Sequence, residues 1–211
     1  MTANRFITVE GIEGVGKSTN IAFIANYLEQ RGETVVCTRE PGGTPGAEAI
    51  RQLVLDTDRS ELGDRSELLL MFAARAVHLE NLIQPALDAG KWVICDRFTD
   101  ATYAYQGGGR GFDFAEIAAL EQLVQGDLRP GLTLLLDGSF ELSVARRAER
   151  TETDRFEKEQ LDFFGKVRDA YLAIAEQQPQ RVRVINAGQT LEQVQQDIAA
   201  ELDACIAGVE G

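Results

Sequence analysis

Residues 11–18 read GIEGVGKS and match the pattern GxxxxGK[ST], which is typical of a loop that binds nucleotide phosphates. Glycines allow successive backbone N–H groups to turn toward a polyphosphate. The Lys17 ammonium can reach the β- and γ-phosphates, and the Ser18 hydroxyl can ligate Mg²⁺. The predicted ATP-binding residues are Gly11, Ile12, Glu13, Gly14, Val15, Gly16, Lys17, Ser18 and Thr19.

A second candidate metal ligand follows the apolar run at residues 92–95. Asp96 ends this run, and an acid in that position of a P-loop enzyme holds Mg²⁺ directly or through water. An Asp here could instead cap the following turn. Arg97 comes next, and its guanidinium suits bidentate binding of phosphate. The predicted metal ligands are therefore Ser18 and Asp96.

Arginines gather around these motifs in two groups. The first group is Arg39, Arg51, Arg75, Arg97 and Arg110. The second is Arg146, Arg147, Arg150 and Arg155, in a polar stretch that we interpret as a mobile lid at about 146–157. Any single surface arginine can be merely solvated. Phosphoryl transfer between two phosphates, however, brings several anions together and requires several cations. The clustering therefore favours a nucleotide kinase.

Two other classes of P-loop protein lack support. The chain contains neither Asn-Lys-x-Asp, which reads guanine in GTPases, nor Leu-Ser-Gly-Gly-Gln, the signature of transporter-type ATPases. A P-loop protein that binds ATP and regulates a partner stays open as an alternative, although such a protein does not need the lid arginines.

Short apolar runs and longer helical patterns alternate along the chain and predict a mainly parallel α/β sheet covered on both faces. The expected strands are 6–9, 35–37, 92–95, 132–136 and 182–185. The expected helices are 17–31, 47–55, 65–82, 114–124, 141–149, 157–177 and 191–207. We interpret residues 107–109, three glycines, as a loop. Such sheets bind ligands at the carboxyl ends of their strands, where the phosphate loop and Asp96 fall.

Composition limits the remaining possibilities. The 211 residues predict a single domain, 1–211. With 21 basic and 34 acidic residues the net charge is −13, which argues against nucleic acid or an anionic membrane as a partner. We expect the excess acid on the outer helices, where five acids between residues 192 and 210 face no Lys or Arg. One His argues against a His-based metal site, and three scattered Cys, with no visible signal peptide, suggest a cytoplasmic protein.

Six segments give the chain a resemblance to a known family over nearly its whole length. They are residues 9–19 (VEGIEGVGKST), 39–44 (REPGGT), 72–75 (FAAR), 96–98 (DRF), 104–110 (AYQGGGR) and 154–156 (DRF). In order and spacing they resemble the thymidylate kinases. The resemblance implies a P-loop nucleoside-monophosphate-kinase-like three-layer fold. It also implies transfer of the γ-phosphate of ATP to dTMP with Mg²⁺, giving dTDP and ADP, by a homodimer.

The same resemblance implies roles for individual residues. Lys17, Arg97 and Arg150 are the implied catalytic residues, Arg150 being the lid arginine expected in the transition state, since no basic residue lies inside the phosphate loop before Lys17. The implied dTMP-binding residues are Glu13, Pro41, Arg51, Met71, Phe72, Arg75, Arg97, Thr102, Tyr105 and Gln106.

Each part of dTMP has its implied partners. Arg51 and Arg97 would hold the phosphate, and Glu13 the sugar 3′-hydroxyl. Tyr105 would lie against C2′ and exclude a ribose hydroxyl. Arg75 would donate to thymine O4, and Thr102 or Gln106 would contact N3.

One departure leaves the stacking residue open. Relatives often carry an aromatic residue four positions before the pocket arginine, where this chain has Met71, with Phe72 beside it. A kinase for another monophosphate or a deoxynucleoside is the alternative function.

Overall fold

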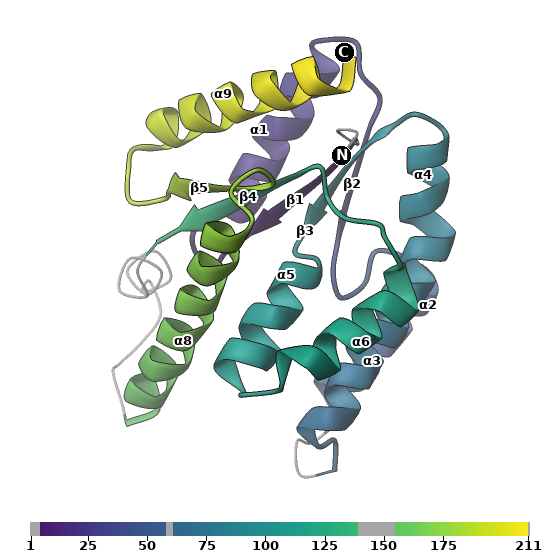
Figure 1. Cartoon of the computed structure of the whole chain (residues 1–211), viewed down its shortest axis with the longest axis vertical. Coiled ribbons are helices and arrows are strands. Elements are labelled where there is room, and N and C mark those ends of the chain that lie inside the picture. The colour runs from purple at the N-terminus through teal and green to yellow at the C-terminus, as the bar shows by residue number, and fades with distance from the viewer. Residues whose placement is uncertain (1–4, 58–60, 139–154, 211) are drawn as a thin grey trace.

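The computed structural model describes residues 5–57, 61–138 and 155–210, and it contains one five-stranded parallel sheet (Figure 1). Its strands are β1 (Phe6–Glu10), β2 (Val35–Arg39), β3 (Trp92–Asp96), β4 (Leu132–Asp137) and β5 (Val182–Asn186), in the order β2-β3-β1-β4-β5. All four pairings are parallel, as predicted. Each strand runs one or two residues beyond its apolar run, because backbone pairing continues into the polar residues at the carboxyl end.

Helices cover both faces of the sheet, which confirms the three-layer architecture (Figure 1). One face carries α1 (Lys17–Glu29) and α9 (Leu191–Glu210), which contact each other. The other face carries α5 (Thr99–Thr102), the π-helix η2 (Tyr103–Gly109) and α8 (Arg155–Gln177). Beside them pack α2 (Pro45–Asp56), α3 (Asp64–His78), the π-helical turn η1 (Leu79–Ile83), α4 (Gln84–Asp88) and α6 (Phe114–Gln125).

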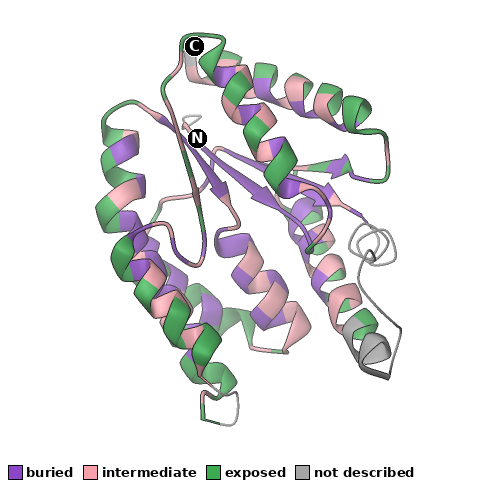
Figure 2. Ribbon diagram, turned by 180° about the vertical axis from the view of Figure 1, so that it is seen from behind, coloured by how far each residue is buried: buried purple, intermediate pink, exposed green. Residues whose placement is uncertain are grey.

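The central strands form the core, as the buried colour of the sheet in Figure 2 shows. Every residue of β1 is buried, including Thr8 and Glu10. The Thr8 hydroxyl is paired with that of Thr133 on β4 at 2.7 Å, which satisfies both groups inside the sheet. A strand buried on both faces reads as a continuous apolar run, which is why β1 could be predicted from the sequence.

The loop predicted at residues 107–109 is wrong, because these glycines are the last turn of η2. They are required by close packing. A Cβ on Gly107 would lie 2.2 Å from Phe114, one on Gly108 would lie 2.5 Å from Ala170, and one on Gly109 would lie 2.6 Å from Phe163. A run of glycines alone suggests a loop, whereas here the missing side chains bring the backbone of η2 against α6 and α8.

One predicted helix runs further than expected, and another falls outside the described residues. The helix expected at 65–82 continues as α3, η1 and α4 as far as Asp88. The helix expected at 141–149, and the first part of the lid, lie outside the described residues.

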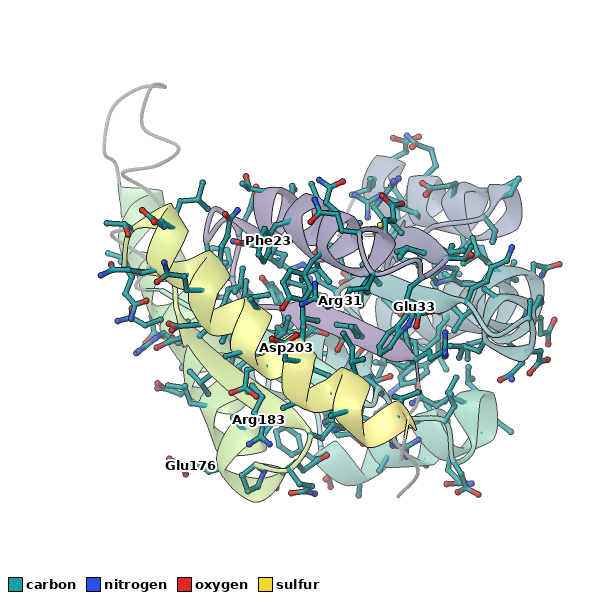
Figure 3. The ribbon with its side chains drawn as sticks, turned by 90° about the horizontal axis from the view of Figure 1, so that it is seen from above. Phe23, Arg31, Glu33, Glu176, Arg183 and Asp203 are labelled. Carbon is teal, nitrogen blue, oxygen red and sulfur yellow. The ribbon has the colours of Figure 1, made fainter. Side chains whose placement is uncertain are left out.

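The acids of α9 are less isolated than predicted. The helix has no basic residue of its own, but Arg31, in the turn after α1, reaches Asp203 at 3.1 Å, and Arg183 of β5 reaches Glu201 at 3.1 Å. Figure 3 shows Arg31 and Asp203 between α1 and α9, and Arg183 beside α9. The partners in each ion pair are far apart in the sequence, so no local pattern predicts either pair. No helix in the described segments is long and apolar enough to cross a membrane.

Candidate active site

The phosphate loop connects β1 to α1 and depends on glycine backbone geometry. Gly11, Gly14 and Gly16 have φ of 128°, 83° and 98°, values that L side chains rarely adopt. A Cβ on Gly11 would also lie 2.5 Å from the carbonyl oxygen of Leu136. The loop therefore passes against β4 and turns into the amino terminus of α1, where the helix dipole favours an anion.

Lys17 is buried within this loop, with 9% of its surface exposed. Its Nζ donates to the carbonyl oxygens of Gly11 at 3.3 Å and Ile12 at 3.1 Å. Burial, with the Arg97 charge nearby, lowers the pKa of Lys17 to about 8. An ammonium held in this way gains favourable charge interactions when a polyphosphate arrives.

A cavity of about 740 Å³ begins at the phosphate loop and continues beneath the ends of β2 and β3. Its lining includes Glu13, Gly14, Gly16, Lys17, Ser18, Thr19, Arg39, Glu40, Pro41, Arg51, Glu67, Met71, Arg75, Asp96, Arg97, Phe98, Ala101, Thr102, Tyr105, Gln106, Arg110 and Phe164. All five arginines of the first predicted group line it. In this acidic chain, the arginines that lie around the predicted motifs are therefore brought together in one cavity.

At the loop end of the cavity, Asp96 and Arg97 lie side by side. Arg97 has φ of 67°, a left-handed conformation that is rare outside glycine and is found at functional sites. Its guanidinium lies 4.7 Å from the centre of the Tyr105 ring, and Nη1 is 3.5 Å from the Tyr171 hydroxyl. Asp96 Oδ1 is buried without a hydrogen-bond partner in the described part of the chain. A buried carboxylate oxygen of this kind is suited to a cation.

At the far end, Arg75 is 4% exposed and is held by two side chains. Its Nε donates to Glu40 Oε2 at 2.7 Å, and its Nη2 donates to Thr102 Oγ1 at 3.0 Å. Nη1 is buried and has no partner among the residues described here. Gln106 donates to Glu67 at 3.3 Å. This end therefore combines a guanidinium that has one unpaired N–H group with amide and hydroxyl groups, a set that fits a nucleobase edge.

The structure separates the two candidates for stacking. Met71 lines the cavity, whereas Phe72 is 2% exposed in a core cluster with Leu68 and Ile117 and is not part of the lining. Of the other predicted ATP residues, Gly11, Ile12 and Val15 do not line the cavity, and Ile12 and Val15 have buried side chains. Gly11 and Ile12 can contribute only through their backbone, whereas Val15 lines a second, smaller hollow. Arg146, Arg147 and Arg150 lie outside the described residues, and for Arg155 only its place at the start of α8 is described.

A smaller hollow of about 290 Å³ lies on the other side of the phosphate loop. It is lined by Val15, Gly16, Thr19, Asn20, Ala187, Gln189, Leu191 and Val194. Asn20 Oδ1 and Gln189 Oε1 are buried there without partners in the described segments. Apolar walls with two free acceptors fit a flat ring that carries an amino group. The sequence contained no motif that predicts this hollow.

Sequence reasoning also missed Glu10, the last residue of β1. Its Oε1 accepts from the backbone N–H of Phe98 at 2.7 Å, and its Oε2 accepts from the Tyr171 hydroxyl at 2.7 Å. Burial, followed by the charge of Asp100, raises the pKa of Glu10 to about 8. The signal was available, because an acid at the end of an apolar strand is the same feature that identified Asp96.

The chain is similar to thymidylate kinases throughout its length. The family described as Thymidylate kinase matches residues 9–198. The thymidylate kinase of Chromohalobacter salexigens is 61% identical over 205 residues, 96% of each chain. That of Ectopseudomonas mendocina is 57% identical over 206 residues, 98% of each chain. The crystal structure of thymidylate kinase from Ehrlichia chaffeensis superimposes with a TM-score of 0.77 at 36% identity, covering 94% of this chain and 97% of that one.

Proposed function

Because the chain belongs to the thymidylate kinase family, we propose that its large cavity holds dTMP and its phosphate loop holds ATP, so that the γ-phosphate passes from ATP to dTMP and leaves dTDP and ADP. The single observation that carries this assignment is the continuity of the cavity. One space is lined by Lys17 and Arg97 at the phosphate loop and by Arg75, Thr102 and Gln106 at its far end, so a nucleotide monophosphate can contact both ends at once.

The proposed orientation of dTMP follows from the charges along the cavity. Arg97 and Arg51 bind its phosphate; Arg51 now donates to the Pro41 carbonyl at 3.1 Å and has further donors to offer. The Arg75 Nη1 donates to thymine O4, Thr102 or Gln106 contacts N3, and Met71 lies along the base. Tyr105, held against Arg97, lies where C2′ of the sugar passes, and Glu13 accepts from the 3′-hydroxyl.

The phosphate oxygen of dTMP is itself the nucleophile, so the proposal requires no general base. The protein contributes position and positive charge, which dominate phosphoryl transfer. Lys17 and the loop amides hold the β- and γ-phosphates, and Arg97 lies between donor and acceptor. We propose that the lid residues Arg146, Arg147, Arg150 and Arg155 add further positive charge, and that Arg150 acts in the transition state. This part of the proposal rests on the family resemblance alone.

The residues near the loop fit Mg²⁺. Ser18 and Asp96 line the same cavity and supply a hydroxyl and a carboxylate, the oxygen ligands that Mg²⁺ prefers. The unpartnered Asp96 Oδ1 supports this assignment. No cluster of three or more His, Cys, Asp or Glu in the described chain could hold a metal, which agrees with an ion bound mainly through substrate phosphates and water. When bound, the ion would neutralise charge on the β- and γ-phosphates.

The smaller hollow beside the loop is our proposed adenine site. It adjoins Gly16 and Thr19 and so lies next to the predicted phosphate position. The free oxygens of Asn20 and Gln189 can accept from the adenine amino group.

We propose that the enzyme is a homodimer formed through α3 and α6. These helices contact each other, and Leu69 on α3 and Leu123 on α6 are 51% and 80% exposed. Sedimentation of the wild type and of Leu123→Lys tests this: a dimer that the variant converts to monomer is expected, and a monomeric wild type contradicts it.

Binding measurements test the site itself. Titration calorimetry with dTMP should give a dissociation constant that Arg97→Ala and Arg75→Leu each weaken by at least about tenfold, since each removes a charged or buried hydrogen bond. Lys91→Ala, on the turn before β3 and outside the cavity lining, is the control and should bind as the wild type does. Unchanged binding in both cavity variants would place dTMP elsewhere.

A further inference from the structure

His78 is the single histidine of the chain, and the reaction proposed above does not use it. It is the last residue of α3, one helical turn after Arg75, and its side chain is completely buried. It lies outside the cavity lining, so it cannot contact dTMP directly. A buried imidazole nevertheless has two nitrogens to satisfy.

Both nitrogens have partners that lead toward the cavity. Nδ1 lies 3.1 Å from Glu40 Oε1, and Nε2 lies 2.7 Å from Thr38 Oγ1. Because a carboxylate only accepts hydrogen bonds, Nδ1 must be the donor to Glu40. The other oxygen of Glu40 accepts from Arg75 Nε at 2.7 Å. A continuous line of hydrogen bonds therefore runs from Thr38 on β2 through His78 and Glu40 to Arg75.

The loop after β2 is shaped around this line. Gly43 has φ of 89°, and a Cβ there would lie 2.4 Å from Thr38 Oγ1 and 2.5 Å from His78 Nε2. Glycine at this position therefore leaves room for the hydrogen bond between His78 and Thr38, and the backbone of Gly43 packs directly against it.

The consequence falls on the guanidinium of Arg75. Glu40 fixes Nε and Thr102 fixes Nη2, so the plane of the group is set and Nη1 is left without a partner among the described residues. Glu40 could rotate about its own side-chain bonds if only Arg75 held it, and the hydrogen bond from His78 removes that freedom.

We propose that His78 is a positioning residue for base recognition: through Glu40 it fixes the direction of Arg75 Nη1 and so sets the preference for a pyrimidine with an acceptor at position 4. This inference rests on the proposed function. A fixed donor accepts thymine O4 and rejects the amino group of cytosine, whereas a donor free to move away discriminates less.

Steady-state kinetics of three variants test the inference. His78→Leu removes both hydrogen bonds and keeps the bulk. We expect its KM for dTMP to rise about tenfold, the effect of one buried hydrogen bond, and its preference for dTMP over dCMP in kcat/KM to fall about tenfold. Its KM for ATP should stay within about twofold of the wild-type value. His78→Asn should restore most of the loss, because its amide can donate from near the Nδ1 position.

Gln125→Leu is the matched control, since Gln125 is a buried polar residue that bonds Thr99 and Leu128 away from the cavity. It should keep both KM values and the preference. If His78→Leu lowers only kcat or the melting temperature, as the control can, His78 is merely structural and the inference fails. Should His78→Leu not fold, Thr38→Val tests the far end of the line, with a rise of about threefold in KM for dTMP expected and no change overturning it. A wild type that does not prefer dTMP would contradict the proposed function instead.

Discussion

Lys17→Met should abolish most turnover and yet make the ligand-free protein more stable. The lysine is 9% exposed, and its pKa is lowered to about 8 from the ordinary 10.5, chiefly by burial. Holding it charged at pH 7 therefore costs about 3 kcal/mol, at about 1.4 kcal/mol for each unit of pKa. Methionine has similar length and removes that cost.

Part of the gain is lost with the two hydrogen bonds from Nζ to the carbonyls of Gly11 and Ile12. At about 0.5–1 kcal/mol each they leave a net stabilisation of roughly 1–2 kcal/mol at pH 7. For a chain of this size that is an increase of roughly 2–8 °C in melting temperature.

The change of the stability difference with pH distinguishes the effect of burying a charged lysine from other effects of the substitution. A lysine whose pKa is lower in the folded state than in the unfolded state binds fewer protons when folded, so wild-type stability rises between about pH 8 and 10.5. The advantage of Lys17→Met over the wild type should therefore be largest below pH 8 and shrink above it. Urea unfolding at pH 7 and pH 10 measures this. A variant that is less stable than the wild type at pH 7, or a difference independent of pH, would refute the burial argument.

Three further predictions concern the same site. Arg97→Ala should stay folded by circular dichroism and lose about a thousandfold in kcat/KM for dTMP, as expected for an arginine between transferring phosphates; near-normal turnover would contradict its role. Asp96→Asn should raise the Mg²⁺ concentration for half-maximal rate about tenfold, and an unchanged Mg²⁺ titration would exclude it as a ligand. Glu10→Gln should gain stability relative to the wild type as pH rises from about 4.5 to 8, by up to about 4 kcal/mol, because the raised pKa of Glu10 makes its charged form costly in the folded state. Urea unfolding at pH 5 and pH 8.5 measures the difference in stability between the two proteins. A difference that is the same at both pH values would show that burial does not raise the pKa of Glu10.

Local chemistry explains which parts of the site the sequence could predict. The phosphate loop has a contiguous motif in which each residue acts through its own backbone or its own side chain. Asp96 and Arg97 could be identified because parallel strands end at one edge, which places their polar residues together. The same rule accounts for Arg39 at the end of β2, whereas Arg51 and Arg75 reach the cavity from the helices α2 and α3.

Long-range packing explains what the sequence could not predict. The phosphate loop at residues 11–18 and the segment at residues 107–109 are both rich in glycine. Residues 107–109, however, pack against α6 and α8, and no local sequence pattern encodes the positions of these helices. The line of hydrogen bonds from Thr38 through His78 and Glu40 to Arg75 joins residues up to 40 positions apart. The choice between Met71 and Phe72 depends on which face of α3 meets the cavity, and adjacent helical residues point about 100° apart.

The measurement that tests the central claim most directly is the rate of ADP release with a panel of acceptors. With ATP and Mg²⁺ present, we predict rapid ADP formation with dTMP, slower formation with dUMP, and little with UMP, CMP or AMP. Equal rates for dTMP and UMP would contradict the role of Tyr105 beside the sugar. ADP formation that does not depend on any monophosphate would contradict the kinase assignment of the cavity itself.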